Sequence, residues 1–289
     1  MTAALTDSLP APADDDRDAS PDGAQRVCVR VRRAGEVKDG DDWLADEVPI
    51  ALIFNGISHA VMLATPFDLE DFALGFGLTE GLLARPDELY GVEVLPDPAG
   101  MRVELEVAGA CFARLKDKRR SMAGRTGCGL CGTESLEQVE PPLAALAPCT
   151  TPLSPPAIAA ALRALPSHQR LAQRTGATHA AAWCGLDGTV RLVREDVGRH
   201  NALDKLVGAM VEVHLDPRDG FCCITSRASV EMVRKAVAAG ITALVAVSAP
   251  TARAVRVARE SGLALAGFAR RDDLVLYADA DRFGAVAPH

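Results

Sequence analysis

Hydrophobic and polar positions alternate in a regular rhythm from Ser154 to the end of the chain. Short apolar runs of strand length are separated by amphipathic stretches of about a dozen residues, which is the periodicity of helices. In chain order the pattern predicts helix 155–173, strands 178–183 and 190–194, helix 200–213, strand 221–225, helix 229–239, strand 243–248, helix 252–261, and strands 263–269 and 274–278. Because strands separated by helices imply right-handed crossovers, we expect residues 152–289 to form a largely parallel sheet in a three-layer α/β domain.

A second, smaller pattern covers residues 26–109. Val27, Val29 and Val31 alternate with polar residues as in a half-buried strand. Residues 50–64 predict a hairpin that turns at Asn55-Gly56, a dipeptide suited to a tight turn. The remaining elements are a helix that starts after Thr65-Pro66, with apolar Phe72, Phe76, Leu82 and Leu83, and two strands at 92–95 and 101–107. We expect a small α+β domain.

Two segments lack such a pattern. Residues 110–151 are interrupted by glycine and proline and are expected to be a loop or linker, and long loops of this kind are often functional. Residues 1–25 are rich in Asp, Ala and Pro and are expected to be a disordered acidic tail. That tail has neither the basic head nor the apolar stretch of a signal peptide.

Composition narrows the class of protein. The chain has 289 residues, of which 48% are hydrophobic and 24% charged, as in a globular protein with room for two domains. No apolar run is long enough to cross a bilayer, and a net charge of −8 gives no support for nucleic-acid binding. Eight cysteines without regular pairing do not resemble a disulfide framework. We therefore expect a cytoplasmic protein with no membrane or nucleic-acid partner.

The expected loop contains a pair of thiols, Cys128 and Cys131, within the sequence Cys-Gly-Leu-Cys-Gly. Such a pair can bind a metal, exchange a disulfide or carry sulfur as a persulfide. A zinc site needs four ligands, and the chain has no second pair of this spacing, although zinc stays an alternative. Buried structural thiols are disfavoured because the neighbours are polar and glycine-rich. A basic run precedes the pair, either as a solvated helix face or as charge that favours a thiolate: Arg114, Lys116, Lys118, Arg119, Arg120 and Arg125.

Polar residues also gather where predicted strands end and helices begin, a place that favours anions in open α/β sheets. Arg199 and His200 open one helix, and Ser226 and Arg227 precede another. These residues exceed what helix capping requires, so we expect a phosphate-bearing ligand there. At a third junction, 248–251, capping is the preferred interpretation. The other histidines are expected to be packed or solvent-facing: His59, His168, His179, His214 and His289.

Several of these segments together resemble one known family. They are Cys128-Gly-Leu-Cys131-Gly, Glu134-Ser-Leu136, Thr178-His-Ala-Ala-Ala182, Arg194-Glu-Asp-Val-Gly-Arg-His-Asn-Ala-Leu-Asp-Lys205, Ser226-Arg-Ala-Ser-x-Glu-Met-Val233, Ser248-Ala-Pro-Thr251 and Gly267-Phe-Ala-Arg270. The chain resembles the formate dehydrogenase accessory sulfurtransferase family, FdhD, over nearly all of its length beyond the acidic tail. The block at 194–205 is the most specific part of the match.

The resemblance implies a sulfurtransferase that accepts sulfur from a cysteine desulfurase as a cysteine persulfide. It would deliver that sulfur to molybdenum in the bis(molybdopterin guanine dinucleotide) cofactor, the bound substrate, before insertion into the formate dehydrogenase catalytic subunit. The persulfide falls on Cys128, with Cys131 assisting or resolving it. The resemblance also implies a homodimer, and it gives no metal of the protein's own.

The family's cofactor-binding loop falls on Phe268, Ala269, Arg270, Arg271, Asp272 and Asp273. Here the chain departs from the family pattern, since Arg271-Asp272-Asp273 stands where glycine is expected after the arginine. The resemblance further implies a cytidine-deaminase-like C-terminal domain without deaminase chemistry. His179 is followed by alanines where a deaminase carries its glutamate, and no Pro-Cys-x-x-Cys motif follows.

Two other functions remain open. A cofactor chaperone would shelter and deliver the cofactor without transferring sulfur. A zinc-stabilised scaffold would use the thiol pair as part of a structural metal site, and chelation would then unfold it.

Overall fold

The structure is a computed structural model that describes residues 23–122 and 143–284, without the side chains of residues 117–122. Cys128 and Cys131 lie outside the described residues. The predicted tail, residues 1–25, also lies almost entirely outside them. Within the described ranges no helix is long and apolar enough to cross a membrane.

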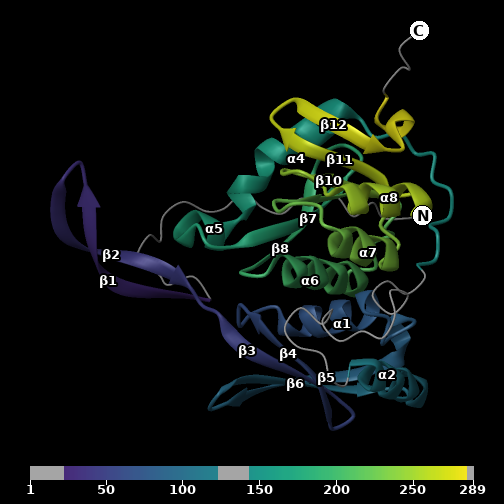
Figure 1. Cartoon of the computed structure of the whole chain (residues 1–289), viewed down its shortest axis with the longest axis horizontal. Helices are drawn as coiled ribbons and strands as arrows, with labels where there is room; N and C mark the ends of the chain where they lie inside the picture. Colours follow the sequence, from purple (N-terminus) through teal and green to yellow (C-terminus); the bar gives the residue numbers. More distant parts are fainter. Residues whose placement is uncertain (1–22, 123–142, 285–289) are drawn as a thin grey trace, which may run out of the picture.

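The first element is a two-stranded arm formed by β1 (Ala24–Arg33) and β2 (Glu36–Ala45). The two strands pair with each other along their whole length, from Ala24 opposite Ala45 to Arg33 opposite Glu36, and they extend away from the rest of the molecule (Figure 1). The predicted strand around Val27–Val31 is confirmed. Strand β2 was not predicted, because its sequence, EVKDGDDWLA, has no apolar alternation.

A four-stranded sheet follows, in the order β4-β3-β6-β5. The bounds are Val48–Phe54 for β3, Ile57–Ala64 for β4, Leu89–Asp97 for β5 and Gly100–Val107 for β6, and a short 3-10 helix, η1 (Pro86–Glu88), precedes β5. The predicted hairpin turn is confirmed, with Asn55 and Gly56 at φ values of 45° and 78°. Asn55 also exchanges two 2.8 Å hydrogen bonds with the backbone of Val107, which joins the turn to β6.

Helices α1 (Leu69–Thr79) and α2 (Gly109–Met122) pack against this sheet. The predicted helix after Thr65-Pro66 is confirmed as α1. Helix α2, in contrast, occupies the beginning of the segment expected to be a loop from residue 110. Cys111 and Leu115, one helical turn apart, are both buried in the core of the N-terminal domain, so this segment is anchored by two apolar contacts rather than by a continuous apolar face.

The C-terminal domain is built on a six-stranded sheet in the order β12-β11-β10-β9-β7-β8. The strand bounds are His179–Gly185 for β7, Val190–Asp196 for β8, Gly220–Ile224 for β9, Ala243–Ala246 for β10, Ala264–Arg270 for β11 and Asp273–Ala278 for β12. Only β9, β10 and β11 pair in parallel. The expectation of a largely parallel sheet was wrong, because β7–β8 and β11–β12 are hairpins closed by short turns and pair antiparallel.

Helices cover both faces of this sheet (Figure 1). Helices α6 (Arg199–Glu212), α7 (Val230–Ala238) and α8 (Ala252–Ser261) share one apolar core with it, and α4 (Pro155–His168) shares the core of the other face. The single helix predicted over 155–173 is two helices, since α5 (Arg170–Thr175) starts after a break at Gln169. A short 3-10 helix, η2 (Ala280–Phe283), ends the described chain. The three layers agree with the predicted α/β class, and likeness to cytidine deaminases stays a prediction.

The two domains meet where α1 lies against α6 (Figure 1). Glycines make this approach possible, because a Cβ on Gly75 would lie 1.8 Å from the carbonyl oxygen of Asp204, and one on Gly208 would lie 2.0 Å from that of Asp71. The helices therefore touch through their backbones at two points. This close contact holds the start of α6 against the N-terminal domain.

Candidate functional site

The sheet brings the strand ends singled out in the sequence to one edge. Strands β8, β9, β10 and β11 run in the same direction, since β7 is antiparallel to both β8 and β9 and the other two are parallel to β9. The loops that follow these four strands, and the residue that begins β7, therefore share an edge. This is the place where open α/β sheets bind ligands.

Backbone hydrogen bonds join these loops to one another. The amide of Thr251 donates to the carbonyl of Ala228 at 3.1 Å, and the amide of Phe268 donates to Ser248 at 3.1 Å. The guanidinium Nε of Arg270 donates to the carbonyl of Val247 at 3.3 Å. The loops after β9, β10 and β11 thus form one continuous rim, although 40 residues separate Arg227 from Gly267 in the sequence.

Most charged side chains in the block 194–205 form hydrogen bonds or ion pairs within the protein. Arg194 pairs with Asp71 of α1 at 2.7 Å, and Glu195 accepts the amides of Leu171 and Ala172 at the start of α5. Two further charge pairs are buried, Asp196 with Lys205 at 2.8 Å and Asp204 with Lys235 at 2.9 Å. The residues of this block that were expected to bind a phosphate are the ones without such partners among the described residues.

Arg199 and His200 are those residues. The buried Nε of Arg199 and the buried Nε2 of His200 have no hydrogen-bond partner among the residues that the structure describes. Burial, together with the nearby charges of Arg199 and Lys235, lowers the pKa of His200 to about 4, so the ring is neutral at physiological pH. Unpaired polar atoms at this depth cost stability, which is the pattern of a site built for a ligand.

Two neighbours were not predicted as site residues. His179 begins β7 opposite Asp196, and burial together with the nearby charge of Arg199 lowers its pKa. Glu231 lies in the first turn of α7. Burial alone would raise the pKa of Glu231, but nearby hydrogen-bond donors and the charge of Arg199 lower it overall. Both residues occur in segments of the family resemblance, and their position within those segments is the signal that could have identified them.

Ser226 and Arg227 lie between these residues and the rest of the rim. Ser226 is buried and donates to the carbonyl of Arg227 at 3.1 Å, whereas the Arg227 side chain is exposed. The guanidinium of Arg227 is thus accessible to a negatively charged ligand. The Ser226 hydroxyl stabilises the backbone of the loop through its hydrogen bond. Ser229 and Thr251 precede helices, and the Thr251 side chain accepts the Ala254 amide, which agrees with the capping role expected at 248–251.

The segment Phe268 to Asp273 forms the end of the β11–β12 hairpin. Phe268 is 46% exposed and has a φ of 49°, an unusual conformation for an aromatic residue. It lies in the irregularity between Gly267 and Arg270 in the pairing of β11 with β12, where its amide donates to the carbonyl of Ser248. Ala269 is buried in the core, so only its backbone can face a ligand.

The remaining residues of this turn are polar and exposed. Arg271 has a φ of 56°, Asp272 pairs with Arg163 of α4 at 2.7 Å, and Asp273 lies opposite Arg270 in the strand register. A left-handed conformation at Arg271 is one that glycine adopts without strain, which gives a physical reason for the glycine expected there. Phe268, Arg270 and Arg271 are exposed side chains of this turn that a phosphate or an aromatic base could contact.

Two residues of the basic run before the thiol pair, Arg114 and Lys116, have described side chains, and both contact the N-terminal domain. Arg114 is part-buried on α2, where it donates to the carbonyl of Leu82 at 2.9 Å and to Glu88, so it belongs to the N-terminal domain. Lys116 lies over the ring of Phe112. Among the described residues no group of three or more His, Cys, Asp or Glu side chains could hold a metal ion.

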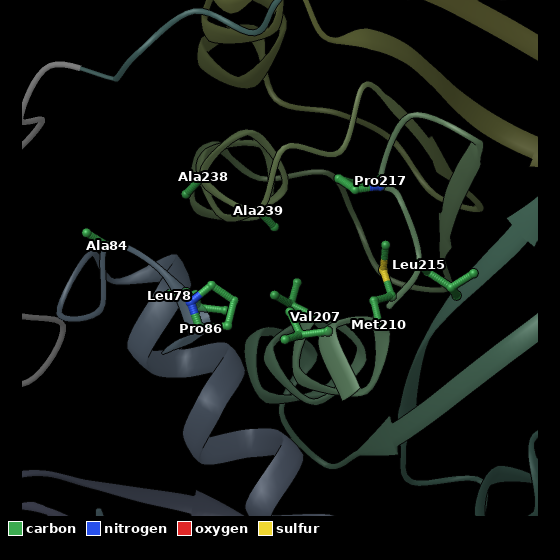
Figure 2. Close-up of a pocket in the computed structure, with 10 residues that line it drawn as sticks. Leu78, Ala84, Pro86, Val207, Met210, Leu215, Pro217, Ala238 and Ala239 are labelled. Carbon is green, nitrogen blue, oxygen red and sulfur yellow. The ribbon is translucent and has the colours of Figure 1, made fainter. Parts of the chain in front are cut away.

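A separate hollow of about 210 Å³ lies between the domains, toward the other end of α6 (Figure 2). It is lined by apolar side chains from α1, α6 and α7 and the loops beside them, including Leu78, Val207 and Met210. None of the described residues that line it is charged, so this lining is unsuited to a phosphate. The polar site therefore lies at the strand edge and not in this hollow.

Comparisons with known proteins show which family the chain is similar to. The model of the FdhD/NarQ family matches residues 45–284. The chain is 58% identical over 257 residues to the sulfur carrier protein FdhD of Variovorax paradoxus, covering 89% of this chain and 92% of the relative. It is 54% identical to the protein of the same name from Cupriavidus necator, with 92% of both chains covered.

A crystal structure shares the fold. It is described as a formate dehydrogenase accessory protein from Desulfotalea psychrophila, with a TM-score of 0.70, 22% identity, and coverage of 90% of this chain and 99% of that one. Identity at this level supports the fold alone. The match to the family over residues 45–284 and the identity to its curated members establish that this chain belongs to the FdhD/NarQ family.

Proposed function

We propose that the protein is a sulfur carrier for the maturation of formate dehydrogenase. It accepts sulfur from a cysteine desulfurase on Cys128, with Cys131 as the assisting thiol, and passes it to the molybdenum cofactor. The names of the relatives support the sulfur-carrier role. The observation that carries the nucleotide part is the pair of buried, unpartnered atoms of Arg199 and His200 at the strand edge.

The chemistry of loading is a thiol–disulfide-type exchange. The Cys128 thiolate attacks the outer sulfur of the desulfurase persulfide, an S–S bond forms to Cys128, and the desulfurase thiolate leaves. No net oxidation occurs in this step. Release as sulfide needs two electrons, and these come from the two thiols when the Cys131 thiolate attacks the Cys128 sulfur and leaves a disulfide.

The ligand of the strand edge is the guanine dinucleotide part of the substrate cofactor. Its phosphates suit Arg199, Arg227 and Arg270, and the exposed ring of Phe268 offers a surface on which a base or a pterin can stack. A neutral His200 can donate or accept a hydrogen bond without adding charge. These residues bind and orient the substrate, whereas the thiols carry out the transfer.

The proposal includes partners. A cysteine desulfurase supplies sulfur and a formate dehydrogenase catalytic subunit receives the cofactor, in the cytoplasm, and we propose a homodimer as the working form. Loading and delivery require that the thiols meet two different proteins. We propose that the segment that bears them presents them to each partner in turn.

Mass spectrometry of the protein after incubation with a cysteine desulfurase and cysteine tests the loading step. We expect a mass gain of one sulfur atom on the peptide that contains Cys128 and Cys131. Cys149→Ser is the matched control, because Cys149 is only partly buried and lies outside the pair. It should gain the same mass.

The outcomes distinguish the alternatives. Absence of the added sulfur in the wild-type protein, together with full support of the dehydrogenase by Cys128→Ser, would favour a cofactor chaperone. A stoichiometric zinc ion in the purified protein, with unfolding on chelation, would favour a metal-stabilised scaffold. Sulfur on the thiol pair that is lost on transfer supports the carrier.

A further inference from the structure

Thr65 of the N-terminal domain is completely buried against the start of α6. Its hydrogen-bond partners there lie 131 and 140 positions later in the sequence. Its amide and its hydroxyl both donate to Asp196 Oδ2, at 3.0 Å and 2.8 Å. Its hydroxyl and carbonyl oxygens accept from Lys205 Nζ, at 2.7 Å and 3.1 Å. Every polar group of Thr65 thus serves the buried Asp196–Lys205 pair.

Asp196 transmits this contact to the site. Its second oxygen, Oδ1, accepts the backbone amide of Gly198 at 2.7 Å and the side-chain amide of Asn201 at 3.0 Å. Asn201 also donates to the carbonyl of Leu63 at 2.8 Å. The loop is therefore bound to the end of β4 through Leu63 as well as through Thr65. Arg199 and His200 lie between these two anchored residues.

Among the described residues, no side chain caps the start of α6 in addition to these anchors. Gly198 is the residue at the helix N-cap, and no side chain there accepts a hydrogen bond from the first turn. A glycine at this position gives the backbone freedom that the anchors must remove. The direction in which Arg199 and His200 point therefore depends on the buried carboxylate of Asp196, and its position depends on Thr65.

We propose that Thr65 is a positioning residue of the nucleotide site, acting through Asp196 and Asn201 on the loop that presents Arg199 and His200. This inference rests on the proposed function, because it takes the strand edge as the cofactor-binding site. Its consequence is that the N-terminal domain, none of whose described residues belongs to the rim, sets the affinity of that rim for the ligand. Ligand binding and packing of the two domains are then linked.

The matched control is Thr79, at the other end of α1. Its hydroxyl donates to Asp204 Oδ1 at 2.6 Å and accepts from Lys235 Nζ at 3.0 Å, so it also bridges a buried Lys–Asp pair between the domains. Within the described residues it has no hydrogen bond to the 196–201 loop. Thr79→Val should therefore lower stability in the way that Thr65→Val does, without changing the orientation of Arg199.

The test is calorimetric titration of the full-length protein with guanosine diphosphate, well below the melting temperature of each variant. We expect Thr65→Val to weaken binding about tenfold, because a hydrogen bond to a buried charge is lost. Thr65→Ser, which keeps the hydroxyl, should bind like the wild type, and so should Thr79→Val. Hydrogen exchange of the peptide around Gly198 should accelerate in Thr65→Val alone.

Unchanged binding and exchange in Thr65→Val, together with lost binding in Arg199→Ala, would overturn this inference and leave the proposed function standing. Failure of both the wild type and Arg199→Ala to bind would contradict the nucleotide part of the proposed function, and the inference would fall with it. If Thr65→Val does not fold, Asn201→Ala tests the contact between Asp196 and the start of α6. It should weaken binding several-fold, and wild-type affinity in that variant would contradict the inference.

Discussion

Lys235 of α7 donates to both carboxylate oxygens of Asp204 of α6, at 2.9 Å each. Both side chains are almost fully buried, and Lys235 also reaches Glu80 at the end of α1 at 2.8 Å. Burial alone would lower the pKa of Lys235, but attraction by Asp204 and Glu80 raises it. The charge thus remains at the meeting point of three helices.

Removing one member of this pair leaves a buried charge without a partner. We expect Lys235→Met to lower the free energy of unfolding by about 3–5 kcal/mol. The double variant Lys235→Met/Asp204→Leu should recover much of that loss, since neither charge is then buried alone. Urea denaturation of the three proteins measures this, with Lys38→Met, which removes an exposed pair with Glu36, as a control that changes little.

The close approach of α1 and α6 predicts a second effect. Gly208→Ala places a methyl group where only 2.0 Å separates its position from the Asp71 carbonyl oxygen, so the helices must move apart. We expect a loss of about 1–3 kcal/mol in the free energy of unfolding. Gly109→Ala, where a Cβ has no neighbour within 4 Å, is the matched control. Equal melting temperatures for the two variants would contradict this packing.

His200 predicts a pH dependence of stability. Its pKa is lowered to about 4 in the folded protein from an ordinary value of 6.5, so the unfolded chain takes up the proton first as the pH falls. Stability should therefore be unaffected by His200 above about pH 6.5 and should fall progressively between pH 6.5 and pH 4, by on the order of 3 kcal/mol.

The measurement is the difference between wild type and His200→Asn in unfolding free energy across this range. Subtraction removes the contribution of the carboxylates that both proteins share. We expect the difference to change with pH only in that window. A constant difference from pH 7 to pH 4 would show that the ring is not buried in its neutral form.

Arg270 predicts an effect on ligand binding. Its side chain lies on the rim beside exposed Phe268, and its loss removes a positive charge close to the expected phosphates. Arg270→Ala should weaken binding of guanosine diphosphate about tenfold, as expected for a charge-assisted hydrogen bond. Arg218→Ala, which removes an exposed arginine paired with Asp216 before β9, should leave binding unchanged. Equal affinities for both variants would remove Arg270 from the site.

The sequence predicted those parts of the fold that depend on residues close to one another along the chain. The Asn55-Gly56 turn and the order of strands and helices after Ser154 could be predicted because turn residues and apolar periodicity lie within a few positions of each other. Strand β2 was missed because its residues are mostly polar and exposed and only its pairing with β1 makes it a strand. Helix α2 was missed because only two buried residues anchor it to the core. The antiparallel part of the sheet was missed because no local signal shows that β7 lies between β8 and β9 and pairs antiparallel with both.

The site could be predicted only in part. Arg199 and His200 stay predicted site residues. The neighbouring charges of the same block form structural hydrogen bonds and ion pairs, several of them with partners that are distant in sequence. Asp196 meets Thr65 across 131 positions and Arg194 meets Asp71 across 123. The sequence around a charged residue does not show whether its side chain forms an ion pair within the protein or is free to bind a ligand. The position of His179 near this site could not be predicted either, since it depends on the strand register that places it opposite Asp196, with the charge of Arg199 nearby.

The most direct test of the central claim is formate oxidation by host cells that lack their own copy of this gene and carry the Cys128→Ala/Cys131→Ala protein. The account predicts loss of formate dehydrogenase activity with normal amounts of the soluble variant, whereas Cys149→Ala supports wild-type activity. Formate oxidation by the double variant at the wild-type rate would contradict it.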